Sequence, residues 1–328
     1  MSEHPFAPYV RILGRGKTGS RSLSMDEAYA AMNMIVRGEV EDVQLGAFLM
    51  LLRVKEESPE ELAGFVRAVR DNIPAPTLSV DLDWASYAGK RRQQAWYLLA
   101  ALALADSGLR VVMHGAAGHT EGRVYSEQLL ALLGETVVQD WQQCSDALDQ
   151  RQFCYVPLSL MSPPLQRIIA LRNHFGLRSP VHSLARLLNP FRAEYSIQSI
   201  FHPAYAESHQ QAAALLEQPH AVVFKGEAGE AERKPEAICR THSVHCGALG
   251  EQSWPKLIEG RQAWQEEMSS APLRAAWRND EIDDYGRQAI IGTIAIALQL
   301  RDSTLDQHAA MNAAADVWAS RNRQRIDS

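Results

Sequence analysis

The sequence has few cysteines and no long apolar segment. Only 4 of its 328 residues are cysteine, which is typical of a protein from a reducing compartment rather than a disulfide-stabilised secreted domain. No apolar run approaches the roughly 18 residues that a membrane-spanning helix needs, and the first residues lack an apolar signal segment. We therefore expect a cytoplasmic protein without a membrane partner. Its hydrophobic content of 46% is enough for a sizeable core.

Acidic residues are also missing, but only from parts of the chain. The net charge is −6, yet residues 4–25, 84–105 and 150–193 contain no Asp or Glu. Because the local field and not the total charge decides what a groove attracts, the chain can present a positive face to an anion. The cations of these three segments are Arg11, Arg15, Lys17, Arg21, Lys90, Arg91, Arg92, Arg151, Arg167, Arg172, Arg178, Arg186 and Arg192.

Residues 1–76 predict a small helical domain. Ser24 with Glu27 has the pattern of a capping box that begins a helix over 24–37. A second helix is expected over about 42–56, and Ser58 followed by Pro59 begins a third. Short helices joined by tight turns are typical of a helical bundle. Residues 164–188 also have a helical pattern, and we expect them to join this domain.

After a link punctuated by prolines, strand-like and helical segments alternate. Apolar segments such as "LRVVMHG" and "HAVVFKGE" are typical of buried strands, and amphipathic segments lie between them. Such alternation predicts an α/β fold with a mostly parallel central sheet. We expect this larger α/β domain to cover residues 77–163 and 189–328.

Near the start, "GRGKTGSRS" contains Gly16-Lys17-Thr18, which resembles the end of a P-loop. A P-loop also needs a glycine at position 11 and a buried strand before it, but Arg11 stands there and "PFAPYVRIL" is a poor strand. Two interpretations remain. The segment is an ordinary lead-in to the next helix, or it is a flexible basic arm whose phosphate contacts would be Arg15, Lys17 and Arg21.

Two further segments predict contacts with phosphate groups. "YAGKRRQQ" places three cations at the start of a helix, whose free N–H groups already favour anions. In "LRNHFGLRSPVHSLARLLNPFR" the arginines have no acidic neighbour in the sequence, and a polyanion would supply their partners. The predicted contacts are Lys90, Arg91, Arg92, Arg172, Arg178, Arg186 and Arg192.

Two clusters contain residue types that bind metals. The first has zinc-type ligands within eight residues but lacks the two separated pairs of a zinc site; its members are Cys239, His242, His245 and Cys246. The second could hold Mg²⁺ or form a solvated acidic loop; its members are Glu227, Glu230 and Glu232. We expect packing or surface exposure for the first and a solvated loop for the second, and therefore no metal.

Several motifs resemble those of the anthranilate phosphoribosyltransferase family, glycosyltransferase family 3, whose fold is shared with the pyrimidine nucleoside phosphorylases. They run from the N-terminal helices through "VVMHG" and "LRNHFGLRSPVHSLARLLNP" to "VVFKGEAGEAE", and so cover nearly the whole chain. The resemblance implies the two-domain fold described above.

The same motifs depart from those of the family's enzymes. The Gly-Thr-Gly-Gly-Asp loop, whose backbone N–H groups hold pyrophosphate, corresponds here to "ASYAGKR" at 85–91. Lys-His-Gly-Asn corresponds to Met113-His114-Gly115-Ala116, and the Asp-Glu pair for Mg²⁺ to Ala231-Glu232. Phosphoribosyl transfer depends on positioning and neutralising pyrophosphate. We therefore interpret Gly89, His114 and Gly115 as a vestigial site, with no catalytic residue and no cofactor.

A closer resemblance is to the YbiB-type proteins, nucleic-acid-binding paralogues of that transferase, in "GRGK", "SYAGKRRQ", "RVYSE", "HSLARLLNPF" and "HPAY". It implies a homodimer joined through the small helical domain and a basic groove that binds DNA or RNA with little sequence preference. Tyr87, His114 and Trp96 are candidates for stacking on bases, although core packing is the safer assignment for Trp96. The alternatives to nucleic-acid binding are a phosphoribosyltransferase with an altered substrate and a dimeric scaffold without a ligand.

Overall fold

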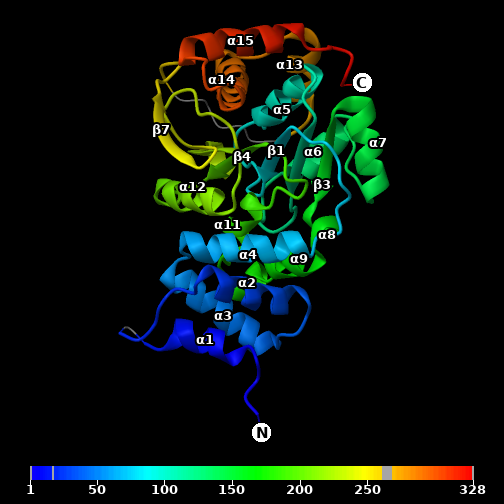
Figure 1. Ribbon diagram of the computed structural model, residues 1–328. Helices are drawn as coiled ribbons and strands as arrows, with labels where there is room; N and C mark the ends of the chain where they lie inside the picture. Colours follow the sequence, from blue (N-terminus) through cyan, green and yellow to red (C-terminus); the bar gives the residue numbers. More distant parts are fainter. Residues whose placement is uncertain (1, 17, 261–267, 327–328) are drawn as a thin grey trace.

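The computed structural model describes residues 2–16, 18–260 and 268–326, and it contains a helical bundle next to a larger α/β domain (Figure 1). Both parts of the predicted fold are confirmed, including the mostly parallel sheet. Among the described residues, no helix combines the length and the apolar character that crossing a bilayer requires.

The helical bundle has one helix more than the sequence predicts. Ser24 and Ser58 accept the N–H groups of Glu27 and Glu61, so both predicted capping boxes are present. The additional helix is short and packs on α3, with the ring of Phe6 just before it 5.1 Å from that of Phe48. The segment before position 15 is therefore an anchored helix, and the candidate basic arm begins only after it. The helices are α1 (Ala7–Gly14), α2 (Met25–Val36), α3 (Asp42–Lys55) and α4 (Pro59–Asp71).

The α/β domain is built on a seven-stranded sheet in the order β3-β2-β1-β4-β5-β6-β7. The first five strands are parallel to one another, and β6 and β7 form an antiparallel hairpin at one edge. β1 falls in the predicted proline-punctuated link. The strands are β1 (Leu82–Ser86), β2 (Val111–Gly115), β3 (Phe153–Pro157), β4 (Tyr195–Ile200), β5 (His220–Lys225), β6 (Cys239–His245) and β7 (Ala248–Trp254).

Helices cover both faces of the sheet, as expected for parallel strands joined by crossover helices. Trp84 of β1 lies in one hydrophobic core and its neighbour Ala85 lies in the other, because successive side chains of a strand alternate. The core around Trp84 includes α5 (Trp96–Asp106), α6 (Ser126–Leu132), α13 (Ala271–Asn279), α14 (Asp284–Arg301) and α15 (Gln307–Ser320). The core around Ala85 includes α7 (Trp141–Arg151), α12 (Ala206–Leu215) and the helical bundle.

The segment from 158 to 187 connects the two parts of the molecule. The helical pattern predicted over 164–188 takes the form of several short helices, because Gly176 has a φ of +66° and Pro180 follows shortly after it. α9 contacts α2 and α11 contacts α4, so this segment packs on the bundle. The helices are α8 (Leu158–Met161), α9 (Pro163–Ala170), α10 (Arg172–Phe175) and α11 (Val181–Leu184), followed by the 3₁₀ turn η1 (Ala185–Leu187).

Candidate functional site

The loops that follow β1, β2 and β5 meet at the carboxyl ends of the parallel strands, where ligands of open α/β sheets bind. Lys90 of the first loop pairs with Val124 of the second in a short antiparallel bridge. Arg123 ties all three loops together: its Nη1 donates to the carbonyl oxygens of Ala88 at 2.9 Å, Gly89 at 2.8 Å and Ala228 at 3.3 Å. The three loops therefore form one junction at the carboxyl ends of the strands.

Lys90 is buried in an ion pair. Its Nζ lies 2.6 Å from Oε1 of Glu232, and the two side chains are 1% and 0% exposed. Glu232 also accepts the N–H of Tyr97 at 2.9 Å; burial raises the pKa of this carboxyl, and Lys90 and the N–H act against the rise. The predicted contact between Lys90 and an external phosphate is therefore wrong for this conformation, because its anion comes from 142 positions further along the chain.

Glu230 is buried as well, and its carboxylate closes the loop after β1. Oε1 accepts the N–H groups of Ala88 at 2.7 Å and Gly89 at 2.5 Å, and the side chain has no exposed surface. The expectation of a solvated acidic loop is thus wrong for Glu230 and Glu232, although Glu227 does pair with Lys234 near the surface.

Arg91 and Arg92 are exposed, as a phosphate contact requires. They do not lie in the first turn of a helix, however, because α5 begins only at Trp96 with Ala95 as its N-cap. Arg91 and Arg92 therefore lie outside the first turn of α5, whose free N–H groups were part of the predicted phosphate contact.

Four arginines from separate parts of the chain gather around this junction, and we call Arg123, Arg172, Arg178 and Arg186 the arginine cluster. Arg172 donates to the carbonyl of His119 at 2.7 Å, and Arg186 donates to those of Ser199 at 2.7 Å and Gly229 at 2.8 Å. Among the described residues, no Asp or Glu forms an ion pair with any of the four. The cluster therefore lacks carboxylate ion pairs within the described chain, although its buried member Arg186 lies close enough to Glu230 for an electrostatic interaction.

The effect of this charge is visible in the neighbouring titrating groups. Burial, together with the arginines Arg123, Arg186 and Arg172, lowers the pKa of Arg178 to about 10. Burial and the same positive surroundings lower the pKa of His119 to about 4 and that of His182 to about 2. Both imidazoles are therefore neutral near pH 7, and the arginines are the cations of the site.

A cavity of about 130 Å³ opens beside the cluster, between the helical bundle and the α/β domain. Arg178 and Arg186 line it from one side, and Arg53 and Glu57, which lie at and just beyond the end of α3, line it from the other. Burial raises the pKa of Glu57 to about 7, with Arg53 acting against the rise. The cavity is therefore least negative below neutral pH.

Aromatic side chains on the segment after β4 also line this cavity. Phe201 is 47% exposed, and its ring lies 4.8 Å from that of His202, which in turn lies 6.3 Å from the ring of Tyr205. All three line the cavity together with the arginines. These three residues were not among the predicted contacts, although "HPAY" belongs to the motifs that carry the closer resemblance.

The residues predicted to stack on bases lie elsewhere. Tyr87 and His114 are 1% and 0% exposed, and their Oη and Nδ1 atoms are 2.8 Å apart. Nε2 of the same imidazole lies 3.2 Å from Oδ1 of the buried Asp83. Trp96 is also in the core, at 3% exposed. The prediction of stacking is wrong for Tyr87 and His114, and the core assignment of Trp96 is confirmed.

The two glycines of the vestigial site have strict steric reasons to be glycine. Gly89 has a φ of +70°, and a Cβ there would lie 3.0 Å from the ring of Tyr125. A Cβ on Gly115 would lie 2.0 Å from the carbonyl oxygen of Ser86. Both therefore fix the close packing of the loop against its neighbours.

The remaining predicted cations are separate from the cluster. Arg21 forms a two-pronged contact with Glu27 at 2.6 and 2.7 Å, and Arg15 is exposed at the end of α1. Lys17 lies outside the described residues. Arg192 is also exposed but precedes the first residue of β4 and lies 3.5 Å from Asp71, so it stands at the amino end of the sheet. The prediction that it shares one wall with Arg172, Arg178 and Arg186 is therefore wrong.

The cysteine and histidine cluster is part of the antiparallel hairpin. Cys239, His242 and His245 belong to β6, and Cys246 is the exposed residue at its turn. Within the described residues, no three His, Cys, Asp or Glu side chains are arranged to hold a metal ion.

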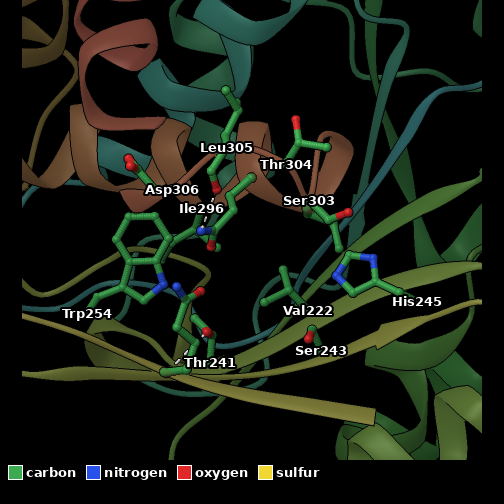
Figure 2. A pocket seen from close by; sticks show the side chains of 13 residues that line it. Val222, Thr241, Ser243, His245, Trp254, Ile296, Ser303, Thr304, Leu305 and Asp306 are labelled. Carbon is green, nitrogen blue, oxygen red and sulfur yellow. Dashed lines mark hydrogen bonds between the residues drawn. The ribbon is translucent and has the colours of Figure 1, made fainter. Parts of the chain in front are cut away.

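A second cavity, of about 350 Å³, lies between β5–β7 and the connection of α14 to α15 (Figure 2). Its lining includes Trp254, Thr241 and His245, and Figure 2 shows these side chains facing the residues of the helix connection. The charged side chain of this lining is a carboxylate, Asp306, which caps α15 by accepting the N–H of Ala309 at 2.7 Å. A cavity with this lining does not favour a phosphate.

Comparison with known proteins relates both parts of the chain to one family. Residues 7–73 match the family described as "Glycosyl transferase family, helical bundle domain", and residues 94–253 match "Glycosyl transferase family, a/b domain". The chain therefore contains both domains of glycosyl transferase family 3, on an anthranilate phosphoribosyltransferase-like scaffold.

Individual relatives agree with this assignment. The YbiB protein of Escherichia coli (strain K12), described as uncharacterized, is 32% identical over 60% of this chain and 63% of its own length. The anthranilate phosphoribosyltransferase of Geobacillus kaustophilus is 28% identical over 64% of this chain and 62% of its own length, so each match spans less than two thirds of the relative. The crystal structure of the Thermus thermophilus anthranilate phosphoribosyltransferase has a TM-score of 0.79 and 23% identity, and the match covers 95% of this chain and 94% of that one; it shows the shared fold.

Proposed function

We propose that this chain, built from the two domains of glycosyl transferase family 3, binds nucleic acid in the cavity between its domains. The observation that carries the proposal is the arginine cluster, which has no carboxylate partner among the described residues. Arginines in such surroundings favour phosphate groups, whose oxygens match the guanidinium fork.

The aromatic residues beside the cluster support a nucleic acid over a small phosphate. Phe201, His202 and Tyr205 stand next to Arg178 and Arg186 in the same lining. Cations that follow a backbone and aromatic faces on which bases stack are the combination found in proteins that bind single strands. We therefore propose a single-stranded DNA or RNA, bound with little sequence preference.

We also propose that the chain forms a homodimer through its helical bundle. Val43 and Val54 of α3 are 79% and 85% exposed, and they offer apolar area to a second copy. A dimer would place two arginine clusters on one ligand and raise the apparent affinity. Analytical ultracentrifugation measures the oligomeric state directly. A monomer at micromolar concentration would contradict the proposed dimer but not the proposed nucleic-acid site.

Fluorescence anisotropy with oligonucleotides of unrelated sequence tests the binding. If the cations contact about five phosphates of a single strand, the logarithm of the association constant should fall against the logarithm of the salt concentration with a slope of roughly −3.5. Single strands should bind more tightly than duplexes of the same sequence, because only unpaired bases can stack. Absence of binding at low salt would contradict the proposal.

A phosphoribosyltransferase is the second candidate, and the comparisons favour it more directly than they favour nucleic-acid binding. The matched domains and the relatives named anthranilate phosphoribosyltransferase support it. The geometry of the loop after β1 argues against it, because the N–H groups of Ala88 and Gly89 already have a carboxylate as acceptor. Calorimetry with phosphoribosyl pyrophosphate separates the two candidates: micromolar, Mg²⁺-dependent binding supports the transferase.

A further inference from the structure

We infer that the carboxylate of Glu230 takes the place of a phosphate in the loop after β1 and excludes pyrophosphate-bearing ligands from it. This inference concerns the ligand that the loop rejects, and it does not depend on what the arginine cluster binds. It assigns to Glu230 the role of a residue that determines specificity.

The loop has the geometry of an anion site. The N–H groups of the consecutive residues Ala88 and Gly89 point at one oxygen, at 2.7 and 2.5 Å, and the φ of +70° at Gly89 turns the backbone so that they converge. Converging backbone N–H groups of this kind form a concavity that binds anions. A carboxylate oxygen and a phosphate oxygen are equivalent acceptors for it, so the two compete for the same donors.

The backbone around Glu230 holds the carboxylate in place. Its carbonyl oxygen accepts the hydroxyl of Ser199 at 2.9 Å, and Arg186 of the arginine cluster donates to the preceding residue, Gly229, at 2.8 Å. A Cβ on Gly226 would lie 1.6 Å from the same carbonyl oxygen of Glu230, so the chain folds back on itself tightly here. The carboxylate therefore sits on a constrained turn.

The loop contains a second group that would attract pyrophosphate, the ammonium of Lys90, and a carboxylate already binds it as well. Lys90, which would neutralise a bound pyrophosphate, is engaged by Glu232 at 2.6 Å with both side chains buried. The second oxygen of Glu230 is buried and has no hydrogen-bond partner among the described residues. A pyrophosphate that entered would meet this unpartnered carboxylate oxygen, and like charges repel strongly in a buried site. The nearest cations, Arg123 and Arg186, already donate to backbone carbonyl oxygens.

The experiment measures binding of inorganic pyrophosphate by isothermal titration calorimetry, with and without Mg²⁺. The proteins are the full-length chain, Glu230→Ala, Glu230→Gln and the control Glu227→Ala, which removes a carboxylate from the same turn without touching the loop. We expect Glu230→Ala to gain a pyrophosphate site, seen as an affinity at least tenfold above that of the wild type, while Glu227→Ala behaves as the wild type does.

Several outcomes overturn the inference. One is tight, Mg²⁺-dependent pyrophosphate binding by the wild type, which needs no variant. Another is a Glu230→Ala protein with a cooperative thermal transition and no gain in affinity. If that variant does not fold, Glu230→Gln decides, because glutamine still accepts the loop N–H groups but lacks the charge: we expect a gain of about threefold, and no gain overturns the inference.

The same proteins separate this inference from the proposed function. Oligonucleotide affinity should not fall in Glu230→Ala, since the carboxylate is buried, faces the loop and acts against the positive charge of Arg186. If the wild-type protein does not bind oligonucleotides, the proposed function is contradicted, but the conclusion from the pyrophosphate titrations is unaffected.

Discussion

The loop after β1 and the arginine cluster lie side by side at the carboxyl ends of the strands, yet their charges are in opposite states. In the loop, Lys90 is paired with Glu232 and the N–H groups are capped by Glu230, and all of this is buried. In the cluster, Arg178 has no carboxylate partner in the described chain, and its arginine neighbours help to lower its pKa. Anion-binding groups are present in both regions, but carboxylates engage them only in the loop.

This difference shows that a gap of acidic residues in the sequence does not establish an uncompensated positive charge. Residues 84–105 and 150–193 contain no Asp or Glu, yet the fold brings Glu230 and Glu232 to the first segment and no carboxylate to Arg178 in the second. Long-range pairing therefore decides which cations remain for function.

We expect the largest effect from replacing Lys90, whose ion pair with Glu232 distinguishes the loop from the arginine cluster. In Lys90→Met, Glu232 becomes a buried charge without its cation, and we expect the free energy of unfolding to fall by about 3–5 kcal/mol. The double variant Lys90→Met with Glu232→Gln should recover most of this loss, because it leaves no buried charge. Urea denaturation followed by circular dichroism measures both.

Arg91→Ala is the matched control, since Arg91 is an exposed cation in the same loop. Its effect on stability should stay within about 0.5 kcal/mol. If Lys90→Met is as stable as Arg91→Ala but binds nucleic acid less tightly, Lys90 is available to ligands after all and the two regions do not differ.

The fold was largely predictable from the sequence because it depends on local signals. The serine caps at Ser24 and Ser58 and the alternation of apolar segments each act over a few residues, and they place α2, α4 and most of the parallel strands. α1 and β1 were missed because they are short, and because the prolines of "PFAPYVRIL" and "IPAPTLSVDLDW" are typical of irregular segments.

The site was predictable only in part. The sequence identifies Arg172, Arg178 and Arg186 as candidates, but the pairing of Lys90 spans 142 positions and the contact between Ala88 and Glu230 does too. The periodicity of apolar residues in the sequence does not indicate which residues so far apart will be in contact. Arg192 shows the same limit in the other direction: it is near the cluster in the sequence and at the opposite end of the sheet in space.

A second substitution tests the arginine cluster. Arg178→Ala should weaken oligonucleotide binding about tenfold at moderate salt and reduce the slope of log affinity against log salt by about 0.7–0.9, the contribution of one phosphate contact. Stability should change little, because Arg178 forms no ion pair in the described chain. Arg192→Ala is the control, an arginine that is more exposed than Arg178 and lies at the amino end of the sheet. Equal effects of the two variants would contradict the proposal that nucleic acid binds in the cavity beside the arginine cluster.

The smallest expected effect is a pH dependence that arises where the two domains face each other. Glu57 lies in the cavity with Arg178, Arg186 and Arg53, and burial raises its pKa to about 7. Two of the cavity's three imidazoles, those of His182 and His209, have pKa values lowered by burial to about 2 and about 3, so they stay neutral between pH 6 and 8. The third, His202, is replaced by Gln in every protein of this test. As the pH falls through 7, Glu57 gains a proton and its negative charge disappears, so the affinity for a polyanion should rise by about two- to threefold. Glu57→Gln should bind at pH 8 as the protein with Glu57 does at pH 6, with no change between them; a variant that keeps the full pH dependence shows that another group titrates. Anisotropy titrations at constant salt measure this, and because the phosphodiester does not titrate in this range, the change reports on the protein alone.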